Sequence, residues 1–223
     1  MALILSIETA TTNCSVAISK DGKTIVLKED NNKNYSHAES LHVFIDSVLK
    51  ASDINPKALD AVAVSKGPGS YTGLRIGVSA AKGLCFALNK PLISVSTLHA
   101  LAHQVKNPDG VIVSMLDARR MEVYSAIYDS NYNEIRAIEA QILDENAFAE
   151  YLNQGKVYFV GNGVEKTKAI INHPNAVFLD NTLPSANEMS ALAFNKYKIS
   201  DTEDVAYFEP YYLKDFVALK SKS

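Results

Sequence analysis

A glycine-rich stretch, KGPGSYTGLRIG at residues 66–77, is the first feature whose residue types suggest chemistry. It lies between two apolar runs, and in that setting backbone N–H groups and a helix N-terminus can hold a phosphate. No Lys-Ser or Lys-Thr pair follows the last glycine, and the spacing does not fit GxGxxG, so the two common phosphate-binding patterns are missing. The pattern by itself favours a tight turn in which Gly67 and Gly69 allow close backbone approach.

Two acidic residues stand at equivalent places in two similar halves of the chain. Glu8 follows the first apolar run, and Asp117 follows a matching run 109 residues later. If both carboxylates faced one cleft, they could position a metal-nucleotide or act as an acid and a base. Alternatively, each carboxylate caps its own hairpin by accepting backbone N–H bonds. The sequence gives these two interpretations equal weight.

Two histidines have the spacing of a zinc site. His99 and His103 stand four residues apart in an expected helix over residues 97–105. No Glu occupies the HExxH position and no third ligand is marked, so a solvated helix face is the favoured interpretation. Neither Cys14 nor Cys85 is a defensible nucleophile, because both lie in apolar runs, and there is no GxSxG elbow. We therefore predict no metal site and no catalytic residue in this chain.

The composition is that of an ordinary globular protein. The 223 residues are 47% hydrophobic and 21% charged. A formal charge of −3 gives no global basic field, so we expect any contact with nucleic acid to be indirect unless a local patch exists. Two cysteines far apart in the sequence are typical of a protein in a reducing compartment. The first residues are expected to form a strand and not a signal peptide. No apolar run reaches the ~18 residues that span a bilayer. We expect a cytoplasmic protein.

The periodicity predicts an α/β protein built from a duplicated unit. Strands are expected over 2–7, 14–19, 24–28, 60–65 and 92–95. Helices are expected over 37–50, 72–88 and 97–105, and Ser36 and Glu39 form a capping box at the start of the first helix. The order is βββαβαβα. The second half restarts at Gly110 with shorter elements, including a helix over 145–152 and a strand over 157–163. We predict two lobes, residues 1–109 and 110–223, that face a cleft.

Two of the predicted helices are candidates for a protein interface. In the helix over 72–88, small residues recur every four positions and form a nearly flat stripe, beside a wide apolar surface. The interface residues that we predict are Leu41, Phe44, Ile45 and Val48 of the earlier helix and Gly73, Leu74, Gly77, Val78 and Ala81 of the later one. The alternative is that both helices pack inside their own lobe.

Four segments taken together carry a resemblance to a known family. KGPGSYTGLRIG, IETATTNCSVAI, AKGLCFALNKPLISVSTLHALA and DARRMEVYSAIYD resemble segments of the TsaB (YeaZ) family. The likeness is dense over residues 2–128 and thinner afterwards, where EPYYLKD at 209–215 resembles the family's terminal strand.

The resemblance implies a fold, a role and partners. The implied fold is that of the ASKHA superfamily (acetate kinase, Hsp70 and actin), with two ribonuclease-H-like lobes. The implied role is that of a non-catalytic scaffold and activating subunit, which pairs with the catalytic paralogue TsaD and the ATPase TsaE to make threonylcarbamoyladenosine in tRNA. ATP and a metal would then belong to the partners, tRNA would be contacted only indirectly, and no membrane would be involved. The implied dimerisation surface is the helices at 37–50 and 72–88, through which a homodimer would form when the partner is absent.

Departures from the catalytic paralogue leave the cleft residues without an assigned ligand. At the positions of the paralogue's metal-binding HxxxH this chain has Thr97 and Leu101, and Thr12 stands where the paralogue has an acid in its first hairpin. The possible ligand or cleft residues are Glu8, Thr12, Gly67, Gly69 and Asp117. Two enzymatic alternatives remain: a metal-dependent glycoprotease-like (M22) peptidase that uses His99 and His103, and a stand-alone ASKHA kinase that uses Glu8 and Asp117.

Overall fold

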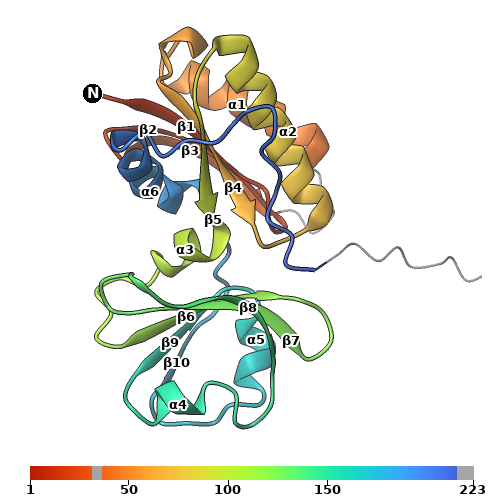
Figure 1. Cartoon of the computed structure of the whole chain (residues 1–223), viewed down its shortest axis with the longest axis vertical. Helices are drawn as coiled ribbons and strands as arrows, with labels where there is room; N and C mark the ends of the chain where they lie inside the picture. The colour runs from red at the N-terminus through yellow and green to blue at the C-terminus, as the bar shows by residue number, and fades with distance from the viewer. Residues whose placement is uncertain (32–36, 215–223) are drawn as a thin grey trace, which may run out of the picture.

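Two five-stranded sheets, one above the other in Figure 1, organise the chain. The structure is a computed structural model, and it describes residues 1–31 and 37–214. The first sheet contains β1 (Leu3–Glu8), β2 (Asn13–Lys20), β3 (Lys23–Asn31), β4 (Ala61–Gly67) and β5 (Leu92–Ser96), in the order β3-β2-β1-β4-β5. The three strands of the meander are antiparallel, whereas β1, β4 and β5 run parallel.

The second sheet repeats the first. It contains β6 (Val111–Asp117), β7 (Glu122–Tyr128), β8 (Glu134–Ile142), β9 (Val157–Val160) and β10 (Ala176–Leu179). Read from β8, the order is β8-β7-β6-β9-β10, which is the order of the first sheet with the same parallel and antiparallel pairings. The predicted duplication is therefore confirmed at the level of topology.

The helices complete the predicted order βββαβαβα in both halves. They are α1 (His37–Ala51), α2 (Tyr71–Leu88), α3 (Thr97–Ala102), α4 (Ala149–Leu152), α5 (Val164–Lys168) and α6 (Ala186–Lys198), with a short 3-10 turn, Pro56–Ala58, before β4. As predicted, the second copy is shortened, because α4 and α5 each make little more than one turn. The Ser36 side of the predicted capping box lies outside the described residues.

Helices cover both faces of the first sheet. On one face, α1 and α2 bury a core that includes Leu5, Val16 and Val62. On the other face, α6 packs Ala186, Met189 and Ala193 against small side chains of the sheet, such as Ala61. The last helix of the second half thus returns to the first lobe, so the sequence division at residue 109 does not describe where α6 packs. In the second lobe, α3 covers one face and α4 and α5 lie on the other (Figure 1).

The segment after α6 crosses the first lobe and reaches the junction of the lobes, as its dark blue trace in Figure 1 shows. Glu203 pairs with the edge of β5 at Leu92, and Lys82 of α2 donates to the carbonyls of Ala206 and Phe208. The backbone N–H of Tyr211 then donates to the carbonyl of Lys66 at 2.7 Å. Within the ranges that the structure describes, no helix has both the length and the apolar character needed to cross a bilayer.

Candidate functional site

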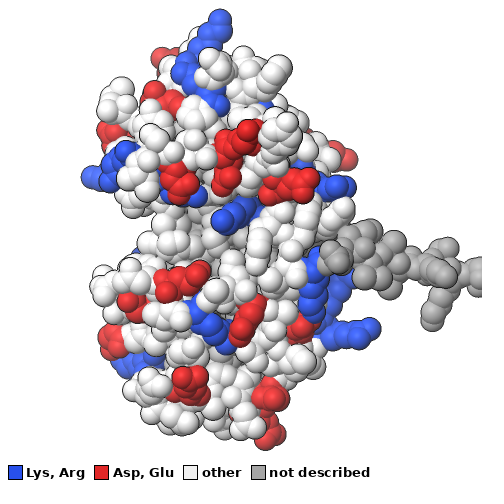
Figure 2. Space-filling view, viewed as in Figure 1, with Lys and Arg blue, Asp and Glu red and all other residues white. Residues whose placement is uncertain are grey.

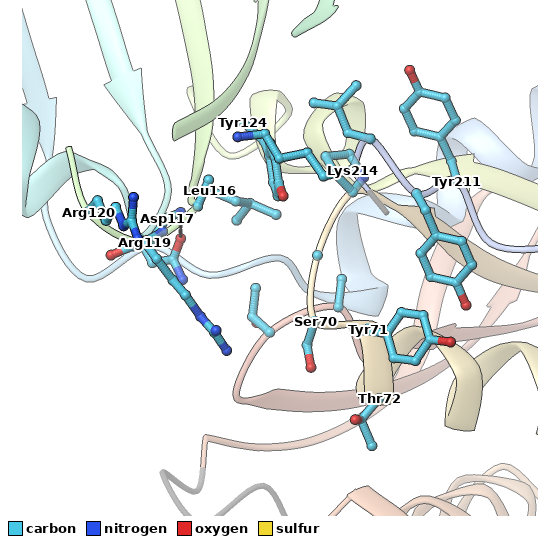
Figure 3. Close-up of a pocket in the computed structure, with 18 residues that line it drawn as sticks. Ser70, Tyr71, Thr72, Leu116, Asp117, Arg119, Arg120, Tyr124, Tyr211 and Lys214 are labelled. Carbon is cyan, nitrogen blue, oxygen red and sulfur yellow. Dashed lines mark hydrogen bonds between the residues drawn. The ribbon is translucent and has the colours of Figure 1, made fainter. Parts of the chain in front are cut away.

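A cleft of about 700 Å³ separates the two lobes. Five segments line it: the loop after β1, the loop after β4 with the start of α2, the β6–β7 hairpin, Asn162 after β9, and the C-terminal segment at Tyr211 to Lys214. Figure 3 shows these segments facing one another across open space. The predicted arrangement of two lobes around a cleft is therefore present.

The glycine-rich loop has the close backbone packing that a tight turn requires. Gly67 has a φ of +109°, and a Cβ there would lie 2.7 Å from the carbonyl oxygen of Tyr211. A Cβ on Gly69 would lie 2.5 Å from the carbonyl oxygen of Ala10, to which the N–H of Ser70 donates at 2.7 Å. The Ser70 hydroxyl caps α2 by accepting from the N–H of Gly73. These contacts account for both glycines without a ligand, although Gly69 also lines the cleft.

The two predicted acids do not meet in the cleft. Glu8 is fully buried, and its Oε1 accepts hydrogen bonds from the N–H of Ala10 at 2.6 Å and from the hydroxyl of Ser65 at 2.8 Å. Burial raises the pKa of Glu8 to about 7. Asp117 lines the cleft, but its Oδ1 accepts from the N–H of Arg119 at 2.6 Å and from Lys166 Nζ at 2.9 Å. Each carboxylate caps its own hairpin, as one of the two interpretations predicted.

Thr12, another predicted cleft residue, is not part of the cleft lining. Its hydroxyl donates to Asn31 Oδ1 at 2.7 Å, across the mouth of the β2–β3 pair, whereas its neighbour Thr11 lines the cleft. Thr12 therefore closes a hairpin in the first lobe.

The histidine pair is packed against aromatic rings. His99 stacks on Tyr128, with ring centroids 5.1 Å apart, and His103 stacks on Tyr132 at 4.1 Å. Both side chains are partly buried, and burial lowers the pKa of both imidazoles, that of His103 to about 4. The prediction of a solvated helix face is thus wrong, because β7 and the turn after it cover this side of α3.

These donors do not fit a metal. In residues 1–31 and 37–214, which the structure describes, no three His, Cys, Asp or Glu side chains are grouped in a way that could hold a metal ion. Asp117 is bound to Lys166, Glu8 is enclosed behind the cleft, and the two imidazoles face tyrosine rings. The arrangement can hold loops and lobes in place, but it offers no ligand set for metal chemistry.

The nine predicted interface residues face the interior of the first lobe. The side chains of Leu41, Phe44, Ile45, Val48, Leu74, Val78 and Ala81 are at most 9% exposed. The stripe of small residues points at β1 and the turn after it, since a Cβ on Gly73 or Gly77 would clash with Thr9. We therefore correct this prediction: the flat stripe allows α2 to approach its own sheet, and these side chains are not on the outer face.

The outer face of α1 and α2 carries different residues. A groove between the two helices is lined mainly by apolar atoms of Ala38, Ile76, Ala80, Gly83 and Leu84, with His42 and Arg75 beside them. Near this groove, Phe86 is 86% exposed and Val43 is 63% exposed. The predicted residues lie on the inward faces of these helices, and the pattern did not separate the two faces because α2 is apolar nearly all round.

Three cationic residues of the cleft were not predicted. Arg119 and Arg120 lie in the loop between β6 and β7, and Lys214 lies in the C-terminal segment. The arginines belong to the quoted segment DARRMEVYSAIYD, and Lys214 belongs to EPYYLKD. The position of the two arginines after β6, the strand equivalent to β1, was available as a signal, but the sequence could not show that they meet Lys214 at one cleft.

Comparisons with known proteins agree with the duplicated fold. A family model described as "TsaD: tRNA N6-adenosine threonylcarbamoyltransferase" matches residues 31–222. A curated relative from Escherichia coli K12, named tRNA threonylcarbamoyladenosine biosynthesis protein TsaB, is 32% identical over 226 residues, which are 97% of this chain and 96% of the relative. The protein of the same name from Haemophilus influenzae is 30% identical over 232 residues, covering 97% and 95%.

A solved structure extends the likeness to three dimensions. YeaZ from Pseudomonas aeruginosa superposes with a TM-score of 0.82 at 26% identity, over 96% of this chain and 100% of that one. This match and the family model confirm the predicted fold class, two tandem ribonuclease-H-like lobes of the ASKHA type. The chain therefore belongs to the TsaB (YeaZ) family.

Proposed function

We propose that the chain takes part in tRNA threonylcarbamoyladenosine biosynthesis as a scaffold and activating subunit that binds homologues of TsaD and TsaE. The observation that carries this proposal is the likeness to proteins named for that pathway over nearly the whole chain. A role in tRNA modification also fits the expected cytoplasmic location.

The geometry of the cleft supports a non-catalytic role. Both acids that a kinase would use are engaged by the protein itself, Glu8 by Ala10 and Ser65 and Asp117 by Arg119 and Lys166. The histidines that a peptidase would use are stacked on tyrosines. Neither enzymatic alternative gains support, and we propose that ATP and a metal belong to the partner subunits and that no cofactor binds tightly to this chain.

The outer face of α1 and α2 is the surface that we propose for docking the catalytic paralogue. Its groove is apolar, and an aromatic ring exposed to the extent of Phe86 is costly to leave in water and typical of an interface. The same face would pair with itself about a two-fold axis in a homodimer when the paralogue is absent.

Reconstitution tests the proposed function directly. The paralogue and the ATPase from the same organism are combined with substrate tRNA, with and without this chain, and threonylcarbamoyladenosine is measured. We expect modification to require the chain. Equally fast modification in its absence would refute the proposal.

A charge on the outer face tests the docking surface. Nothing lies within 4 Å of a Cβ built on Gly83, so Gly83→Glu places a carboxylate in the groove without a clash inside the lobe. Ala191→Glu is the matched control, because it adds the same charge to an exposed position of α6, which covers the opposite face of the sheet. We expect Gly83→Glu alone to weaken binding of the paralogue, on the order of tenfold or more, by calorimetry.

A further inference from the structure

The cleft between the lobes has the opposite charge balance to the chain as a whole. The chain carries a formal charge of −3. The cleft, however, is lined by three cationic side chains, Arg119, Arg120 and Lys214, and by one carboxylate, Asp117. Asp117 is paired with Lys166 and Lys214 with Glu122, so the two arginines carry the unpaired charge of the lining. In Figure 2, blue side chains gather at the waist of the molecule, beside the end of the described chain. A local positive potential of this kind attracts phosphate groups.

The two arginines line the cleft, and their guanidinium groups are available to a ligand. Both have a left-handed backbone, with φ of 68° for Arg119 and 48° for Arg120, so the loop turns tightly at these two residues. Both are exposed, and within the described part of the chain neither guanidinium has a hydrogen bond or an ion pair. Figure 3 shows Arg119 extending into the space between the lobes.

Tyrosine rings supply the other half of the cleft. Tyr124, Tyr71, Tyr211 and Tyr212 line it, and the rings of Tyr71 and Tyr212 lie 5.0 Å apart at one wall. Tyr211 is 41% exposed. Cations that track a backbone and aromatic rings that stack on bases are the two elements of single-strand recognition.

A metal-bound nucleotide fits the same residues less well. Mg²⁺ on nucleotide phosphates needs carboxylate oxygen, and in this cleft Asp117 is held by Lys166 while Glu8 lies buried outside the lining. Phosphodiesters, in contrast, bind arginine without a metal.

We infer that this cleft binds a single-stranded segment of RNA, with Arg119 and Arg120 on its phosphates and the rings of Tyr124 and Tyr211 against its bases. The inference rests on the proposed function, in which tRNA is the substrate of the complex. The expectation from the sequence is that the chain contacts tRNA only indirectly. The inference is instead that the cleft contacts tRNA directly.

Binding of a fluorescent single-stranded RNA to the full chain, followed by anisotropy, tests the inference. Arg119→Gln combined with Arg120→Gln should weaken binding roughly tenfold and lower the slope of log K against log salt by about 1.4, that is about 0.7 for each lost phosphate contact. Lys23→Gln combined with Lys57→Gln is the matched control, because both lysines are exposed, lie in the first lobe outside the cleft lining and change the net charge equally. The control should bind as the parent does.

The tyrosines give a second measurement. Tyr211→Ala should lose roughly tenfold in affinity, whereas Tyr211→Phe, which keeps the ring, should bind RNA as the parent does. Three outcomes would each overturn the inference. The arginine and lysine double variants could lose RNA affinity equally, or the parent could fail to bind RNA. AMP could also displace the RNA at concentrations near that of the protein. If RNA binding fails while reconstituted modification still requires the chain, the inference is wrong and the proposed function stands.

Discussion

Glu8 and Asp117 make the same contact at the ends of equivalent strands. Each side chain accepts a hydrogen bond at 2.6 Å from the backbone N–H two residues further on, Ala10 in the first lobe and Arg119 in the second. Their surroundings differ, because Glu8 is enclosed in the first lobe whereas Asp117 is about half exposed. The duplicated unit therefore keeps a local cap in both copies and places only the second one at the cleft.

The buried carboxyl of Glu8 makes stability depend on pH. Burial raises its pKa from 4.5 to about 7, and its Oε2 has no donor among the residues described. Between pH 4.5 and 7 the folded chain keeps a proton that the unfolded chain has released, so the free energy of unfolding falls as the pH rises through this window, by about 3 kcal/mol. Glu8→Gln should remove most of that fall, measured by urea unfolding at pH 5 and pH 8.

An exposed carboxylate gives the control for this measurement. Glu39→Gln, on the outside of α1, should keep the difference between pH 5 and pH 8 that the parent shows. If Glu8→Gln retains the full difference, the buried carboxyl is not its source.

Two glycines of α2 should respond to alanine with opposite signs. A Cβ on Gly77 would clash with Thr9 Oγ1, whose hydroxyl donates to the carbonyl of Gly73 at 2.8 Å, so Gly77→Ala should lower the free energy of unfolding by roughly 1–3 kcal/mol. Gly83 has open space around it, so Gly83→Ala should raise it by about 0.5–1 kcal/mol through helix propensity. Denaturant unfolding of the two variants measures both effects. A stabilising Gly77→Ala would contradict the inward orientation of the stripe.

The duplication and the element order were predictable because they depend on local periodicity. The apolar alternation of the meander and the offset from Glu8 to Asp117 survive in the sequence itself. The direction of a helix face is harder to predict: α2 is apolar on nearly every side, so the pattern did not distinguish the stripe at Gly73 and Gly77 from the outer groove at Gly83.

Long-range contacts account for the remaining differences. The small side chains of α6 match those of the first sheet, such as Ala61, but no local signal assigns a helix to a lobe formed by a distant part of the chain. The rings that cover His99 and His103 come from Tyr128 and Tyr132, beyond the next strand. The cleft likewise combines residues from five separated segments, so the meeting of its cations could be found only in three dimensions.

The packing of His103 predicts an imidazole that stays neutral at unusually low pH. Burial, followed by the nearby charges of His99 and Lys106, lowers its pKa to about 4. The stability that the neutral ring contributes is present above pH 6.5 and is lost as the pH falls towards 4, because the unfolded chain takes up a proton first. NMR titration should show the His103 ring signals unchanged from pH 8 to pH 5. Titration near pH 6.5, or a shift on addition of zinc, would contradict this packing.

Lys166 should hold the arginine loop in place. Its Nζ, on a side chain only 17% exposed, donates to Asp117 Oδ1 at 2.9 Å, to the carbonyl of Arg120 at 3.0 Å and to the carbonyl of Glu122. Lys166→Met leaves these acceptors without their donor, so the free energy of unfolding should fall by roughly 1–3 kcal/mol and amide exchange in the loop of residues 118–121 should become faster.

A second lysine of the same helix provides the comparison. Lys168 pairs with Asp180 at 2.9 Å, but both side chains are more than half exposed, and such pairs contribute at most about 1 kcal/mol. Lys168→Met should therefore change stability little and leave exchange in the loop unaltered. Because Lys166 anchors the carbonyl of Arg120, next to Arg119, Lys166→Met should also weaken RNA binding. Lys168→Met, outside the cleft lining, should not. Equal behaviour of the two variants would mean that the loop holds its shape without Lys166.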